Sequence, residues 1–78
     1  MNRTVRIYSV PTCLHCIRTK QFLKDNDIAF EDIDVSTNKI AVEEMVRKSG
    51  QMSVPVLDID GQIIIGFERE KIKAALGV

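Results

Sequence analysis

The order of strand-like and helical segments most constrains how this 78-residue chain can fold. Residues 3–9 alternate polar or charged side chains with apolar or aromatic ones, a pattern typical of a strand. Residues 13–26 contain no glycine or proline and repeat apolar side chains three and four positions apart, which predicts a helix. Residues 28–35 have the composition of a second strand. Two strands joined through a helix are expected to run parallel with a right-handed crossover.

The second half of the chain predicts a hairpin between two further helices. Residues 54–59 and 62–65 flank Asp60-Gly61, a pair that readily adopts a tight type I′ turn, so these two strands are expected to be antiparallel. Pro55 cannot donate a ladder hydrogen bond, which places it at a strand edge or strand start and makes a cis peptide a candidate. The helix before the hairpin ends near Ser49 and is capped by Ser36, Thr37 or Asn38, and the helix after it ends at Gly77. The predicted class is α/β, in the order β-α-β-α-β-β-α with one mixed sheet.

Length and charge narrow the classes of function. Seventy-eight residues allow one domain, expected to span residues 1–78 as a monomer. Eleven basic and eleven acidic residues cancel, which argues against nucleic acid or an acidic membrane surface as the partner. We expect a cytoplasmic protein, because the chain shows neither a signal-peptide pattern nor an apolar run of membrane-spanning length.

The pair Cys13 and Cys16 lies at the predicted start of the first helix. Unpaired N–H groups and the positive end of the helix dipole stabilise a thiolate there, and a thiolate is the species that attacks a disulfide. We therefore expect Cys13 to be the nucleophile. Cys16, one turn deeper, is expected to resolve the mixed disulfide, which makes Cys13–Cys16 a redox-active disulfide.

Residues beside the two cysteines are candidates for tuning their redox potential. These are Thr12 before the pair and Leu14 and His15 between its members. The His15 imidazole either stabilises a neighbouring thiolate, which would favour a disulfide-forming oxidant, or is an ordinary exposed helix residue. Residues 1–24 contain five basic side chains and no acidic one, which either favours a thiolate or is solvated surface charge.

The same two cysteines could form half of a metal site. A closed zinc site needs about four nitrogen or sulfur ligands, and His15 is the only histidine in the chain. We therefore expect no metal within one chain. Zinc or an iron–sulfur cluster held between two chains is kept as the competing function, that of a binding module.

Three segments together resemble the glutaredoxins and the related small dithiol redoxins of the NrdH type. They are residues 7–16, Ser53-Val54-Pro55 and Gly66-Phe67, and the similarity extends over nearly the whole chain. The resemblance implies a thioredoxin fold whose four-stranded mixed sheet is flanked by three helices, with Pro55 in cis facing the Cys13 sulfur. It also implies that an extended substrate peptide docks on the Val54 backbone, with Ser53, Gly66 and Phe67 nearby.

The resemblance further implies protein disulfides as substrates, including ribonucleotide reductase, no bound cofactor, and electrons supplied by NADPH through a reductase. Glutathione-using members typically have a basic residue where this chain has Val10, and a Gly-Gly followed by an acidic residue where it has Gly66-Phe67-Glu68-Arg69. We therefore favour thioredoxin reductase over glutathione as the reductant. Leu14 replaces a proline found in many relatives, so the redox potential does not follow from the resemblance.

Overall fold

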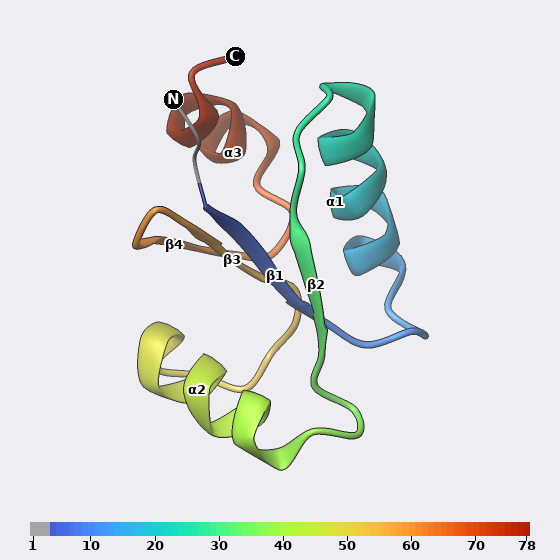
Figure 1. The fold of residues 1–78 in the computed structure, drawn as a ribbon, viewed down its shortest axis with the longest axis vertical. Coiled ribbons are helices and arrows are strands. Elements are labelled where there is room, and N and C mark those ends of the chain that lie inside the picture. The colour runs from blue at the N-terminus through green and yellow to red at the C-terminus, as the bar shows by residue number, and fades with distance from the viewer. Residues whose placement is uncertain (1–3) are drawn as a thin grey trace.

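The computed structural model describes residues 4–78, and its elements follow the predicted order (Figure 1). The elements are β1 (Val5–Ser9), α1 (Leu14–Asp25), β2 (Glu31–Asp34), α2 (Lys39–Ser49), β3 (Val56–Ile59), β4 (Gln62–Ile65) and α3 (Arg69–Leu76). None of the helices in this part of the chain is long and apolar enough to cross a membrane.

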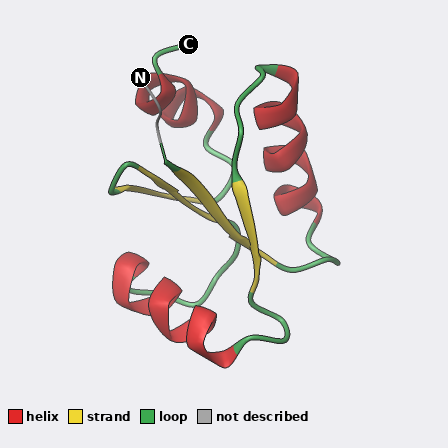
Figure 2. Ribbon diagram, in the orientation of Figure 1, coloured by secondary structure: helices red, strands yellow, loops and turns green. Residues whose placement is uncertain are grey.

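The four strands form one mixed sheet in the order β2-β1-β3-β4 (Figure 2). β1 pairs with β2 in parallel, and the other two pairings are antiparallel. Helices α1 and α3 lie on one face of this sheet and α2 lies on the other (Figure 1). This arrangement is the thioredoxin fold with a four-stranded mixed sheet and three helices, as predicted.

Alternation along β1 divides the hydrophobic core between the two faces. Val5 and Ile7 pack on the side of α1 and α3, in a buried cluster that also includes Leu23, Leu57, Ile59, Ile64, Ile72 and Leu76. Tyr8 packs on the side of α2, with Val35, Ala41, Met45 and Val56. Helices α1 and α3 thus contribute to the first cluster and α2 to the second.

Two strands, β2 and β3, begin later than predicted, and each difference has a local cause. β2 begins at Glu31 rather than residue 28, because the chain is still leaving α1: Asp27 has a positive φ of 56° and the Ile28 N–H bonds to the Leu23 carbonyl at 2.9 Å. β3 begins at Val56, directly after Pro55, which has no N–H to donate. β1 begins at Val5; the predicted strand also included Arg3, which lies outside the described residues.

The turns and caps follow the predicted chemistry. Asn38, one of three candidates, caps α2 by accepting a hydrogen bond from the Ala41 N–H at 3.1 Å. Asp60 and Gly61 both have positive φ, 52° and 94°, as a type I′ hairpin requires. The Asp58 side chain supports this turn by accepting a hydrogen bond from the Gly61 N–H at 2.8 Å.

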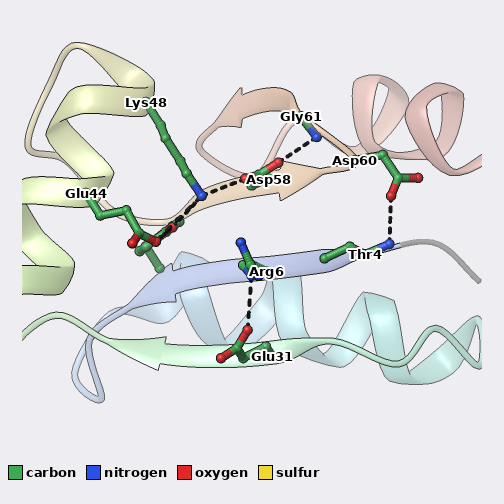
Figure 3. Close-up of polar contacts among 9 residues, drawn as sticks. Thr4, Arg6, Glu31, Glu44, Lys48, Asp58, Asp60 and Gly61 are labelled. Carbon is green, nitrogen blue, oxygen red and sulfur yellow. Dashed lines mark hydrogen bonds and ion pairs between the residues drawn. The ribbon is translucent and has the colours of Figure 1, made fainter.

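A polar network lies between the sheet and α2 (Figure 3). The Tyr8 hydroxyl donates to Glu44, and Lys48 Nζ donates to the Tyr8 oxygen and to Asp58, both at 2.8 Å. Burial lowers the pKa of Lys48, but its hydrogen bonds to Asp58 and Tyr8 outweigh this effect and raise the pKa to about 12. The network thus satisfies the polar groups that the inner face of α2 covers.

Candidate active site

Cys13 lies in the turn between β1 and α1, where its sulfur caps the helix. The Cys13 N–H bonds to the Val10 carbonyl at 3.2 Å, which closes the turn after β1. Its Sγ then accepts a hydrogen bond from the Cys16 N–H at 3.2 Å, the position that a serine or aspartate oxygen occupies at other helix starts. A negative charge on this sulfur is therefore stabilised by a backbone donor and by the helix dipole.

Cys16 differs from Cys13 in burial and acidity. Its side chain is fully buried, whereas Cys13 is partly exposed. Burial, followed by the hydrogen bond with Cys13, raises the pKa of the Cys16 thiol to about 11, although the Val10 backbone and the Lys20 charge act in the opposite direction. Cys16 is therefore a neutral thiol at neutral pH, out of reach of an external disulfide.

The segment before β3 faces Cys13 from the other side. The Val54–Pro55 peptide is cis, and the Val54 carbonyl oxygen lies 4.0 Å from Cys13 Sγ. Pro55 is buried, and its carbonyl oxygen accepts a hydrogen bond from the Gly66 N–H at 2.8 Å. Within residues 4–78 the Val54 N–H has no hydrogen-bond partner, so this backbone segment is free to pair with another chain.

Four of the remaining candidate residues lie on the surface around Cys13 and Cys16. Thr12, Leu14 and His15 are exposed, and the His15 side chain has no hydrogen-bond partner among the residues that the structure describes. Ser53 is also exposed, in a loop where its N–H bonds to the Gln51 side chain at 2.8 Å. The structure thus brings together Cys13, Cys16 and Val54 and leaves these four on the surrounding surface.

Phe67 is held against α1. Its ring lies edge-on to that of Phe22, with 6.1 Å between the ring centroids, and the Arg69 guanidinium lies 5.6 Å from the Phe22 centroid. Gly66, just before it, has a positive φ of 79°, which turns the chain out of β4. The segment after β4 therefore presents an aromatic side chain packed on α1.

One contributor to the site was not identified from the sequence, and a second is one of the five basic residues of segment 1–24. Val10 acts through its backbone, which any residue could supply, so no sequence signal marks it. Lys20 lies four residues after Cys16 and forms an ion pair with Asp32 on β2, at 3.0 Å. Its spacing from Cys16 places both on one side of the helix, and its charge opposes the rise in the pKa of the Cys16 thiol. Arg6, another basic residue of segment 1–24, forms an ion pair with Glu31 at 3.1 Å and not with a group of the site.

The described part of the chain contains no cluster of metal-binding side chains. Among residues 4–78, no group of three or more histidine, cysteine, aspartate or glutamate side chains is arranged to hold an ion. Within these residues the two cysteines are thus a pair of thiols rather than part of a larger ligand cluster.

A thioredoxin fold with two unequal thiols at the start of α1 defines a class, the thioredoxin-fold dithiol proteins. The sequence pattern of the glutaredoxin family matches residues 5–64. The chain is 46% identical over 68 residues to an uncharacterized glutaredoxin-like protein of the rubredoxin operon of Clostridium pasteurianum, covering 87% of this chain and 91% of that one. It is 37% identical over 64 residues to glutaredoxin 3 of Escherichia coli, covering 82% and 77%. This chain belongs to the glutaredoxin family.

A solved structure adds a second kind of relative. The NrdH-redoxin of Escherichia coli, described as a glutaredoxin-like protein with a thioredoxin-like activity profile, superposes with a TM-score of 0.82 at 27% identity and covers 91% of this chain and 92% of its own. Family membership and the adjacent cysteines identify the chain as a thiol–disulfide oxidoreductase.

Proposed function

We propose that this chain is a dithiol redoxin that reduces protein disulfides through Cys13 and Cys16. The Cys13 thiolate attacks one sulfur of the substrate disulfide, forms a mixed disulfide and releases the other substrate sulfur as a thiolate. Cys16 then loses its proton and attacks Cys13 Sγ, which forms the Cys13–Cys16 disulfide and releases the second substrate sulfur. Two electrons pass to the substrate in each cycle.

The inequality of the two thiols is the observation that carries this assignment. Cys13 is partly exposed and its sulfur already accepts a backbone N–H, so it can react with a disulfide that arrives from outside. Cys16 is fully buried, and its pKa is raised to about 11. It can therefore react only with a sulfur that is already attached to Cys13.

We assign substrate docking to the segment Ser53-Val54-Pro55. A substrate strand that pairs with the free Val54 backbone would bring its own disulfide next to Cys13 Sγ, 4.0 Å from the Val54 oxygen. Gly66 and Phe67 would border this strand, because the Gly66 N–H is bonded to the Pro55 carbonyl. Ribonucleotide reductase is one candidate substrate, and a reducing compartment such as the cytoplasm is the corresponding location.

The oxidised chain is proposed to be recharged by NADPH through thioredoxin reductase rather than by glutathione. Val10, where glutathione-using members typically carry a basic residue, packs against the apolar cluster beneath α2 and supplies no charge. Phe67 occupies the position of a second glycine and packs on Phe22. The thioredoxin-like activity profile of the NrdH-redoxin supports the same choice.

A coupled assay distinguishes the two reductants. The oxidised protein is mixed with NADPH and either thioredoxin reductase or glutathione with glutathione reductase, and NADPH consumption is followed with a protein disulfide as the final acceptor. We expect turnover with thioredoxin reductase and little with glutathione. The variants Cys13→Ser and Cys16→Ser serve as controls: the first should be inactive and the second should accumulate the mixed disulfide.

The reverse preference would show that the chain is a glutathione-dependent glutaredoxin. No turnover with either system, together with stoichiometric zinc or iron in the purified protein, would replace the redoxin proposal by a metal-binding module. A measured redox potential well above about −220 mV would instead favour a disulfide-forming oxidant.

A further inference from the structure

Lys20 lies one helical turn beyond Cys16, on the side of α1 that faces the sheet. Its side chain is only 21% exposed, and its Nζ is 3.0 Å from Asp32 Oδ2. The other carboxylate oxygen, Asp32 Oδ1, accepts a hydrogen bond from the Ser9 hydroxyl at 2.7 Å. Ser9 is itself buried at the end of β1.

These contacts fix the ammonium group between three elements. Asp32 pairs in register with Ile7, which packs in the core beneath α1, and Ser9 lies two residues further along the same face of β1. The two strands therefore hold one end of the ion pair, while α1 holds the other. A lysine that simply faced solvent would not be anchored in this way.

We propose that Lys20 promotes the resolving step by stabilising the negative charge that develops on Cys16 Sγ, and that Asp32 and Ser9 hold Lys20 in place for this purpose. Because Lys20 acts through Cys16, it is a positioning residue rather than a catalytic one. This inference rests on the proposed role of Cys16 as the resolving thiol.

The resolving step needs this help more than the first attack. Cys13 is partly exposed and its sulfur accepts the Cys16 N–H, whereas Cys16 must form a thiolate inside the protein. When Cys16 attacks, the Cys16–Cys13 disulfide bond forms, the bond from Cys13 to the substrate breaks, the substrate sulfur leaves with the electron pair, and the Cys16 proton passes to solvent. A fixed positive charge lowers the free energy of the charged transition state more than that of the neutral thiol.

The charged surroundings of Cys16 are simple enough for a clean test. Among the described residues, the titratable groups with the largest effects on the pKa of its thiol are Cys13 and Lys20, both from α1. On the face toward α1, β1 contributes the uncharged Ile7 and Ser9, and β2 contributes Asp32, which is already paired with Lys20. Asp34 is the other carboxylate of β2 on this face, and it is exposed and bonded to Ser36.

The experiment uses the reduced full-length protein and 5,5′-dithiobis(2-nitrobenzoate) in stopped flow. Attack by Cys13 releases the first nitrothiobenzoate at a rate that depends on reagent concentration, and resolution by Cys16 releases the second at a rate that does not. We expect Lys20→Gln to slow the second phase about three- to tenfold at pH 7, to move its pH profile to higher pH, and to leave the first phase unchanged. Lys20→Arg should restore most of the rate.

Lys24→Gln is the matched control, because Lys24 is one turn further along the same helix and is exposed. Its second phase should match that of the wild type, and thermal unfolding of all variants shows whether they are folded. Equal second-phase rates in Lys20→Gln and the wild type would overturn the inference about Lys20 alone. A wild-type protein that releases only one nitrothiobenzoate would instead refute the proposed role of Cys16.

Discussion

Alkaline pH should destabilise the reduced protein through Cys16, and the size of the effect follows from its environment. Burial and the hydrogen bond with Cys13 raise the pKa of Cys16 from 9.0 to about 11. Because the folded protein holds the Cys16 proton more tightly than the unfolded chain does, Cys16 contributes stability that is fully present below pH 9. This contribution is lost as the pH rises through 11. At pH 10 the Cys16 thiol is mostly ionised in the unfolded chain and mostly protonated in the folded one. The free energy of unfolding is therefore about 1.4 kcal/mol lower than at pH 7.

Urea unfolding of the reduced protein at pH 7 and pH 10, compared with Cys16→Ser, measures this loss. Tyr8 and Lys48 also have raised pKa values and destabilise the fold at high pH, but they do so in both proteins. The decrease in the free energy of unfolding between the two pH values should therefore be about 1.4 kcal/mol smaller in Cys16→Ser. Equal decreases in the two proteins would show that Cys16 titrates like a solvent-exposed thiol and would contradict its proposed role as a protected resolving thiol.

Three further predictions concern the thiols, the buried ion pair and the hairpin turn. Iodoacetamide at pH 7 should modify Cys13 in the native protein and Cys16 only in urea, as mass spectrometry of the labelled peptides would show, because Cys16 is fully buried. Lys48→Met should lower the free energy of unfolding by about 3 kcal/mol in urea titrations, because it leaves the Asp58 carboxylate, 12% exposed, without its countercharge. Gly61→Ala should cost about 1 kcal/mol in thermal unfolding, because Gly61 has a φ of 94°, and a loss below a few tenths would contradict this.

Local sequence signals were sufficient to predict the order of helices and strands and to identify the two reactive thiols. Asp60-Gly61 marked the hairpin, and the spacing of Cys13 and Cys16 at the start of α1 indicated the chemistry, because each signal depends on neighbours within a few residues. The cap of α2 could be narrowed only to three candidates. Only the path of the chain into the helix selects Asn38.

Contacts between distant segments could not be derived in the same way. The ion pair of Lys20 with Asp32 depends on how α1 lies across β2, and the network of Tyr8 with Lys48 depends on how α2 packs on the other face. Both use ordinary charged or polar residues at positions that, in the sequence alone, are compatible with solvent exposure. Periodicity identifies the inner face of a helix, but it does not identify the partner across the interface.

The geometry of the site originates in the antiparallel pairing of β1 with β3. Cys13 follows the end of β1 and Val54 precedes the start of β3. Because the two strands are antiparallel, the end of β1 and the start of β3 lie side by side. The register that aligns Tyr8 with Val56 therefore sets the separation of Cys13 Sγ from the Val54 oxygen across 41 residues of sequence. The Tyr8 hydroxyl is in turn bonded to Lys48, so α2 stabilises this strand pair from the face opposite to α1. The polar network on the α2 face of the sheet thus helps to maintain the β1–β3 register that places Cys13 beside Val54, although none of its side chains takes part in the redox reaction.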